Sequence, residues 1–151
     1  MKKADKVVEL SKPEIDGKDI LEVACGGADF STSASKYANS LTCVDIDDSR
    51  IKGKTLPENV RFEIMDAASM SYPDGSFDNV FLYNAFFHVQ TQWNDIEKEC
   101  LRVLRPSGKI VIIGTWKLDV NLMLDTFGDA AKWKDGYLIV PIEKENEYEN
   151  S

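Results

Sequence analysis

Short apolar segments alternate with amphipathic segments along most of this chain, and this alternation limits the folds that the chain can adopt. Continuous apolar runs are typical of strands that are buried on both faces of a sheet. The six strands that we expect from such runs are Asp19–Ala24, Leu41–Asp45, Val60–Met65, Asp78–Tyr83, Lys109–Gly114 and Tyr137–Ile142.

Helices are expected between these strands. Apolar residues recur at three- and four-residue spacing over Trp93–Leu104, which predicts an amphipathic helix that ends at the turn sequence Arg105–Gly108. Further helices are expected over Phe30–Ala38 and Leu118–Ala131, with a weaker helical pattern over Ala4–Leu10. Alternating strands and helices with right-handed crossovers predict a mostly parallel, doubly wound sheet with helices on both faces. The fold class is therefore a three-layer α/β/α sandwich.

The chain has 151 residues, which is enough for one domain with a substantial core. We expect that domain over residues 1–143 and an acidic tail without fixed structure over residues 144–151, because the tail has little apolar surface to offset its ordering entropy. The formal charge of −8 disfavours a nucleic-acid partner. No apolar run approaches the roughly 20 residues of a membrane span.

The three cysteines Cys25, Cys43 and Cys100 are widely spaced and lie in apolar segments. Their spacing does not match that of zinc ligands, so no metal site is expected. Buried thiols suit a reducing compartment better than disulfides do. The first ten residues also lack the apolar run of a secretory signal. Together these features predict a cytoplasmic protein.

The loop after the first expected strand consists of small residues, Ala24, Cys25, Gly26, Gly27 and Ala28, and opens a helix. Small residues let a backbone approach a ligand closely, and a new helix offers free N–H groups. The loop could thus hold a cofactor, or it could be a tight turn without a ligand. The dinucleotide fingerprint G-x-G-x-x-G is not matched, which leaves a nucleotide-dependent dehydrogenase as a minor alternative.

Two acids frame this loop. Glu22 lies in the strand before it, where its carboxylate could meet a cationic group of a ligand or bind the amides of the loop. Asp45 ends the second strand, which is the usual place of an acid that binds a ribose diol. Ile46 follows and could lie against a flat base. Alternatively, the acids around Asp45 cap the next turn.

Taken together, these segments resemble motifs of a known family. ILEVACGGADFS and LTCVDIDDSRI are similar to motif I and the acidic motif that follows it in the class I S-adenosylmethionine-dependent methyltransferases. Val60–Ala68, SYPDGSFDNVFLYNAFFHV and LRVLRPSGKIVII resemble the next three core motifs in the same order. The most similar group is the small-molecule "type 11" group, which includes ubiquinone and menaquinone biosynthesis methyltransferases. The resemblance covers about residues 15–115.

The resemblance implies S-adenosyl-L-methionine as cofactor, S-adenosyl-L-homocysteine as product and a small-molecule methyl acceptor. By similarity, Glu22 and the 24–28 loop would hold the methionine part and Asp45 the ribose. The other implied cofactor residues are Ile46 beside the adenine, Asp66 and Ala67 at its polar edge, and Tyr83 and Asn84 near the methyl group. A carboxylate beside a backbone N–H supplies the acceptor and donor that adenine needs.

Three departures from the family pattern bear on function. Ala24 and Ala28 stand where the family often has glycine, and Ala28 could crowd the cofactor or shift the turn. Asp47–Asn59 has room for one helical turn where the family has a full helix. Only one convincing strand follows residue 131, which predicts a shortened C-terminal edge of the sheet. That shortening keeps open a second reading, a non-catalytic S-adenosylmethionine-binding module or partner subunit, and an unpaired edge could also support a homodimer.

Methyl transfer from a sulfonium needs alignment more than acid–base chemistry, so no catalytic residue is assigned. His88 follows the fourth strand and is a weak candidate for a general base; a packed, polar position on the first turn of the next helix fits it better. Several aromatic side chains could form an apolar wall for the acceptor or belong to the core: Tyr72, Phe86, Phe87, Trp93, Trp116 and Trp133.

Overall fold

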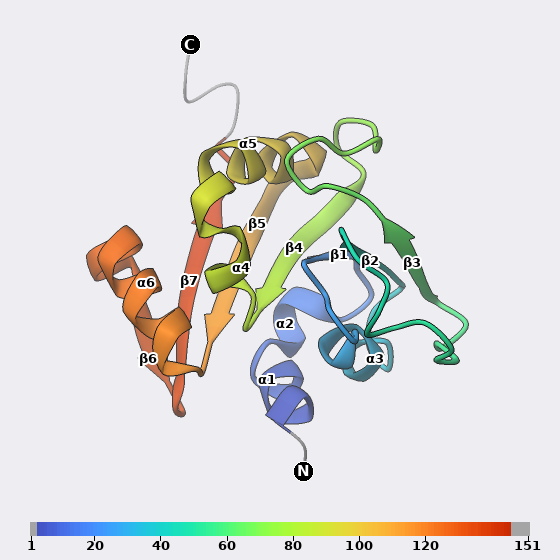
Figure 1. The fold of residues 1–151 in the computed structure, drawn as a ribbon, viewed down its shortest axis with the longest axis horizontal. Helices are drawn as coiled ribbons and strands as arrows, with labels where there is room; N and C mark the ends of the chain where they lie inside the picture. Colours follow the sequence, from blue (N-terminus) through green and yellow to red (C-terminus); the bar gives the residue numbers. More distant parts are fainter. Residues whose placement is uncertain (1–2, 146–151) are drawn as a thin grey trace.

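The computed structural model describes residues 3–145 and shows one seven-stranded sheet (Figure 1). The order across the sheet is β3-β2-β1-β4-β5-β7-β6. The strands are β1 Asp19–Val23, β2 Ser40–Asp45, β3 Val60–Ile64, β4 Phe77–Tyr83, β5 Leu104–Gly114, β6 Lys132–Lys134 and β7 Tyr137–Glu143. β1 to β5 pair in parallel, whereas β7 is antiparallel to both of its neighbours. The predicted α/β sandwich with a mostly parallel sheet is confirmed.

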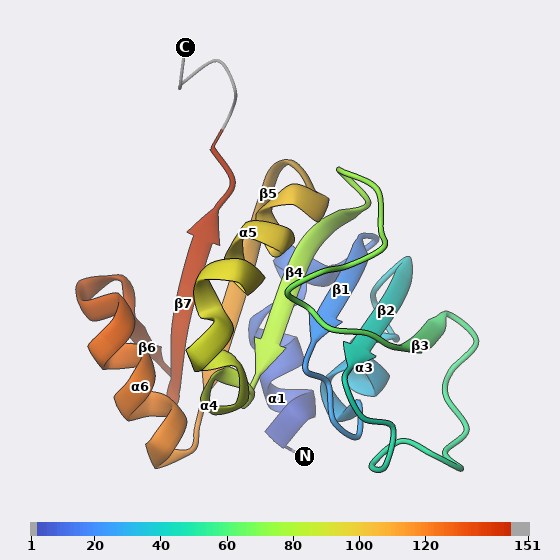
Figure 2. The same ribbon diagram turned by 45° about the horizontal axis from the view of Figure 1, so that its top comes forward.

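Helices cover both faces of the sheet. They are α1 Lys3–Leu10, α2 Lys12–Ile15, α3 Asp29–Ala34, α4 Phe86–Val89, α5 Trp93–Val103 and α6 Lys117–Phe127, with short 3-10 turns at Gln90–Gln92 and Gly128–Ala130. α5 lies in front of the sheet in Figure 2 and α1 and α3 lie behind it. Each face has its own apolar core. One contains the buried face of α5, and the other contains buried residues of α1, α2 and α3.

The order of the strands reverses next to β1, which is paired with β2 on one side and with β4 on the other. The chain winds from β1 outward to β3 and then crosses back to β4. At such a point the loops after the two central strands separate, and they leave a crevice beyond the carboxyl ends of the strands. The topology thus places the 24–28 loop and the end of β4 beside each other.

The largest difference from the sequence prediction lies at the C-terminal edge. The expected single strand after residue 131 was wrong, because β6 pairs with β7 and completes the sheet. β6 has only three residues and all of them are exposed, so it carries no apolar run that a sequence pattern could reveal. The edge strand is short, but the sheet is not missing a strand.

The turn predicted at Arg105–Gly108 lies inside β5, which begins at Leu104. The pairing of β4 with β5 is irregular here, since Phe77 pairs with Leu104 and Asn79 already pairs with Lys109. A Cβ on Gly108 would lie 2.5 Å from the Asp78 carbonyl oxygen, so the close approach of the strands requires glycine. The helix therefore stops where predicted, but the chain enters the sheet at once through a bulge.

The segment between β2 and β3 contains turns and no full helix. The N–H of Lys52 donates to the Asp48 carbonyl at 2.8 Å, so residues 48–52 form one helical turn, as the length of the segment predicted. The predicted tail lies outside the described residues except for 144 and 145. Lys144 is bound to the sheet, because its backbone N–H donates to Gly108 and its ammonium donates to the Leu104 carbonyl. In the described part of the chain, no helix has the length and apolar content needed to cross a bilayer.

Candidate active site

A cavity of about 950 Å³ lies at the carboxyl ends of the central strands. This volume is within the usual range for a small-molecule site. Its wall includes residues 24–27 of the loop after β1, the residues after β2 and β3, the end of β4 and the residue before α6. All the cofactor residues expected from the sequence, from Glu22 to Asn84, line this one cavity, as does His88.

The 24–28 loop turns sharply out of β1. Ala24, Gly26 and Ala28 all have positive φ, at 56°, 54° and 61°. This alternation folds the backbone so that the N–H of Ala28 donates to the Cys25 carbonyl at 2.8 Å. The Ala28 methyl is fully buried in the core, and it is not part of the cavity wall. The concern that Ala28 crowds a cofactor is therefore wrong, because its side chain points into the protein.

Glu22 supports this loop from below. Its side chain is only 1% exposed, and one carboxylate oxygen accepts the backbone N–H of Ser31 at 3.2 Å and the Ser31 hydroxyl at 2.7 Å. Burial raises the pKa of Glu22 well above its usual value, and the Ser31 hydrogen bonds counteract part of that effect. Of the two roles considered for Glu22, the hydrogen bonds to the backbone after the loop are the ones present.

Asp45 joins the ends of β1 and β2. Its Oδ2 accepts the N–H of Gly26 at 2.8 Å, and its Oδ1 accepts the N–H of Asp47 at 3.2 Å. The carboxylate thus braces the glycine loop and also caps the following turn, as the alternative reading proposed. Each oxygen can accept a further hydrogen bond, and Asp45 lines the cavity. Ile46, next in the chain, is 75% exposed and lies at the cavity wall.

Asp66 and Ala67 lie in the loop after β3. Asp66 Oδ1 accepts the N–H of Ala68 at 2.9 Å, which shapes the loop and leaves the second oxygen without a hydrogen bond from the described residues. Both Asp66 and Ala67 line the cavity. An acceptor and a backbone donor therefore stand side by side here, as the adenine role requires.

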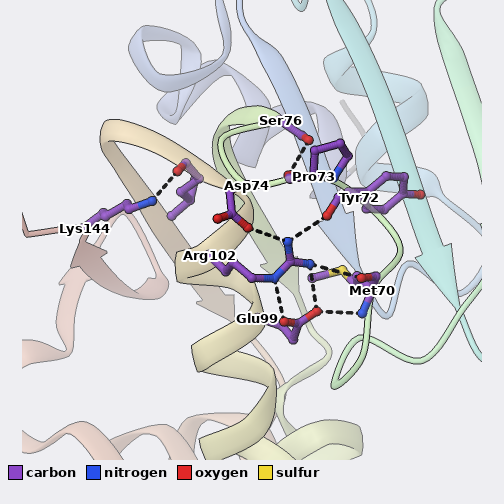
Figure 3. A network of polar contacts seen from close by, with 9 residues as sticks. Met70, Tyr72, Pro73, Asp74, Ser76, Glu99, Arg102 and Lys144 are labelled. Carbon is purple, nitrogen blue, oxygen red and sulfur yellow. Dashed lines mark hydrogen bonds and ion pairs between the residues drawn. The ribbon is translucent and has the colours of Figure 1, made fainter.

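The sequence analysis missed Arg102, which holds the continuation of this loop (Figure 3). From the last turn of α5, its guanidinium donates to the carbonyls of Met70 and Tyr72 at 3.0 and 2.8 Å, and to Asp74 and Glu99 at 2.8 Å each. Glu99 in turn accepts the N–H of Met70 at 2.7 Å. The hydrogen bond from the Arg102 guanidinium lowers the pKa of Glu99. An arginine near the C-terminal end of a helix was a visible signal, but its partners are about 30 residues away in sequence.

The end of β4 forms the next part of the wall. Asn84 has φ of 50°, and its side-chain oxygen accepts the N–H of Thr115 at 2.8 Å, which links β4 to β5. Burial raises the pKa of Tyr83 to about 12, so its hydroxyl stays protonated at neutral pH. His88 lies on α4 with its side chain exposed at the cavity, and Trp116 faces the same cavity while 49% exposed.

The remaining aromatic candidates divide between core and surface. Phe86 and Trp93 are buried and pack against each other with ring centroids 5.3 Å apart. Tyr72 donates its hydroxyl to Glu63 and packs on Phe77. Phe87 and Trp133 are exposed, but they do not line the cavity. Of the six aromatic residues considered, Trp116 alone is part of the cavity wall.

Asp119 is a second residue that the sequence analysis missed. Its side chain is fully buried in the first turn of α6. Oδ1 accepts the N–H of Phe87 at 2.7 Å, while Oδ2 has no partner among the described residues. Burial raises the pKa of Asp119. An acidic residue in the first turn of a helix is common, so its burial could not be read from the sequence.

The residues of this cavity fit a nucleoside-containing ligand. Asp45 and Asp66 supply acceptors at two separate loops, the 24–28 backbone leaves Gly26 without a side chain beside them, and the volume admits a small molecule. Within residues 3–145, no group of three or more histidine, cysteine, aspartate or glutamate side chains could hold a metal ion.

Comparisons with known proteins agree with this arrangement. The model of a methyltransferase domain family matches residues 21–112. A 2-methyl-6-phytyl-1,4-hydroquinone methyltransferase of Synechocystis is 34% identical over 105 residues, which are 66% of this chain and 32% of the relative. A ubiquinone/menaquinone biosynthesis C-methyltransferase of Rickettsia bellii is 30% identical over 124 residues, 72% of this chain and 49% of the relative.

Comparison of the fold with solved structures also identifies methyltransferases. The solved structure of a SAM-dependent methyltransferase from Aquifex aeolicus matches with a TM-score of 0.74 at 18% identity, and covers 95% of this chain and 90% of that one. The chain spans about a third to a half of the length of the two curated relatives. From the family match and the five motifs in the same order, the chain belongs to the class I S-adenosylmethionine-dependent methyltransferases.

Proposed function

We propose that this chain binds S-adenosylmethionine in the 950 Å³ cavity and transfers its methyl group to a small-molecule acceptor. The observation that carries this proposal is the convergence of Asp45, Asp66 and the 24–28 loop on one cavity. The printed names of the two curated relatives refer to a hydroquinone and to ubiquinone and menaquinone biosynthesis. These names support a small organic acceptor.

The residues take the following roles in this proposal. Asp45 accepts from the ribose hydroxyls, and Asp66 and the N–H of Ala67 bind the polar edge of the adenine. Ile46 covers the adenine from the open side. The methionine part lies on the 24–28 backbone, which Glu22 supports through Ser31, and Tyr83 and Asn84 border the methyl group.

The bound cofactor supplies an activated methyl group on a sulfonium. The protein then has to align the acceptor with that methyl and exclude water. In this proposal Trp116 offers the acceptor a flat apolar surface, and His88, which lines the same cavity, lies on the helix after β4. His88 acts as a base only if the acceptor atom carries a poorly acidic proton.

The decisive test compares cofactor binding by matched variants. We expect isothermal titration to show binding of S-adenosylhomocysteine by the wild type and a loss of about 10- to 100-fold in affinity for Asp45→Asn, because one charge-assisted acceptor is worth roughly 1.5–3 kcal/mol. The matched control is Asp48→Asn, since Asp48 is next to the same turn but does not line the cavity. Absence of binding by the wild type at millimolar ligand would refute the proposal.

The transfer itself is tested by the release of S-adenosylhomocysteine from S-adenosylmethionine in the presence of hydroquinones, phenols and small amines. Acceptor-dependent release by the isolated chain supports a complete catalytic unit. Release that requires an added partner chain would favour the non-catalytic alternative for this chain.

Two further predictions belong with this proposal. The free, buried thiols of Cys25, Cys43 and Cys100 support a reducing, cytoplasmic location. A homodimer through the sheet edge stays a prediction that light scattering would test, and β6 offers only three residues for such pairing.

A further inference from the structure

Two cations from the segment between β2 and β3 lie directly on the glycine loop. A Cβ on Gly26 would lie 2.6 Å from Nη1 and 3.1 Å from Cζ of Arg50, so the guanidinium occupies the space that the missing side chain leaves. Lys54 approaches the next residue, and its Nζ donates to the Gly27 carbonyl at 3.0 Å. Both side chains line the cavity.

Arg50 is the cation at this wall with the most donors to offer a ligand. Within residues 3–145, no hydrogen bond or ion pair engages its guanidinium, which carries five N–H donors. Lys36 at the same cavity already lies 3.9 Å from Asp5. Lys54 uses one donor on Gly27 and retains two. The side chains of Arg50 and Lys54 are exposed, so they can adjust to a ligand without disturbing the core.

The charge of the surrounding wall decides what these cations can recognise. Glu22, Asp29, Asp45, Asp47 and Asp66 also line the cavity. A ligand carboxylate would be repelled by such a wall unless a cation faced it. The planar fork of an arginine matches a carboxylate through two parallel hydrogen bonds, and a nearby lysine can add a third.

We propose that Arg50, assisted by Lys54, forms a carboxylate subsite on the glycine loop that binds the amino-acid carboxylate of S-adenosylmethionine. This inference rests on the proposed function, because that function places the methionine part on the same loop. Asp45 and Asp66 are assigned to the uncharged ribose and adenine, so the anionic end of the ligand is matched to the two cations. The absence of a helix between β2 and β3 lets both side chains reach across the loop.

The test uses two ligands that differ in one group. S-adenosylhomocysteine carries the carboxylate, whereas its decarboxylated analogue keeps the adenine, ribose, sulfur and terminal amine. We expect isothermal titration to show about 10-fold tighter binding of S-adenosylhomocysteine by the wild type. Arg50→Gln should lower the affinity for S-adenosylhomocysteine about 10-fold and the affinity for the analogue less than about 2-fold. A tenfold loss is what we expect when one carboxylate–guanidinium pair is removed from a partly exposed site.

Matched variants separate charge from general effects. Arg50→Lys should retain part of the affinity that Arg50→Gln loses. Lys54→Gln should lower the affinity for S-adenosylhomocysteine about 3-fold and leave that for the analogue unchanged, because it removes a single hydrogen bond to a charged group at an exposed site. Lys52 lies in the same turn but does not line the cavity. Lys52→Gln should therefore change the affinity for neither ligand. Raising the salt concentration should weaken the binding of S-adenosylhomocysteine more in the wild type than in Arg50→Gln.

The outcomes distinguish this inference from the function on which it rests. If the wild type binds neither ligand, the proposed function fails. If the wild type binds S-adenosylhomocysteine but Arg50→Gln lowers the affinity for both ligands equally, the carboxylate subsite is wrong and the proposed function stands. Tighter binding of both ligands by Arg50→Gln would also overturn the subsite, because it would show that the guanidinium blocks the cavity.

Discussion

The carboxylate of Asp119, in the first turn of α6, accepts the backbone N–H of Phe87, in α4, at 2.7 Å. This hydrogen bond connects two helices that lie beside residues of the cavity wall. His88 follows Phe87 on α4, and Trp116 precedes α6. A buried carboxylate thus sets the distance between the two sides of the proposed acceptor site. The burial of Asp119 also lowers stability, because its Oδ2 has no hydrogen-bond partner among the described residues.

Asp119→Asn should stabilise the protein, and the gain should grow with pH. Burial raises the pKa of Asp119 in the folded chain above 3.8. The folded state therefore holds this proton to higher pH than the unfolded state, and the wild type loses stability as pH rises from about 4 through the folded pKa. Each pKa unit between the two states is worth about 1.4 kcal/mol, and asparagine, which cannot ionise, still accepts from Phe87.

Urea unfolding between pH 4 and pH 8 measures this difference. The control is Asp125→Asn, an exposed position on the same helix, which should change little at any pH. A difference between Asp119→Asn and the wild type that does not vary with pH would show that folding leaves the pKa of Asp119 unchanged.

Arg102→Met should loosen the loop that carries the proposed adenine site. The guanidinium binds two backbone carbonyls and two carboxylates of this region, so its loss should cost about 2 kcal/mol. Hydrogen exchange should rise at residues 68–76, and the affinity for S-adenosylhomocysteine should fall. Lys98→Met is exposed on the same helix and serves as the control. Unchanged exchange at 68–76 would contradict the positioning role.

Ala24→Gly should stabilise the folded protein by about 0.5–1 kcal/mol. Ala24 has φ of 56°, where an L residue with a Cβ is strained by about 1–2 kcal/mol, and glycine relieves that strain at the expense of a more flexible unfolded chain. Thermal unfolding measures the change. Ala34→Gly, at the last residue of α3, is the opposite case and should destabilise by about 1 kcal/mol, because it removes a fully buried methyl group and relieves no strain. Destabilisation by Ala24→Gly would show that the turn tolerates alanine without strain.

Trp116 should report ligand binding by fluorescence. It is 49% exposed at the cavity, whereas Trp93 is 6% exposed and Trp133 lies on β6 outside the cavity wall. We expect S-adenosylhomocysteine to reduce the quenching of Trp116 by iodide, because the ligand covers part of its ring. Trp116→Phe should abolish the response and Trp133→Phe should retain it. A response that persists in Trp116→Phe would place the ligand elsewhere.

The sequence by itself determined the parts of this protein that depend on local pattern. The pattern of apolar residues identified β1, β2, β3, β4 and β7 to within one residue at each end, because strands that pack in a covered sheet need apolar side chains. The acids and the small-residue loop were placed correctly at the cavity because parallel strands bring their carboxyl ends to one edge of a sheet. β6 escaped detection because its three residues are exposed, and its pairing depends only on backbone hydrogen bonds.

Only the tertiary structure decided how side chains far apart in the chain meet. The Asp119–Phe87 bond, the Arg102 cluster and the position of Arg50 over Gly26 each join residues separated by 24 or more positions. Burial is a property of the whole fold, so the raised pKa of Asp119 and the inward direction of the Ala28 methyl could not follow from local sequence. Periodicity and loop composition specify where a site will lie, whereas packing between distant elements specifies its charge and its shape.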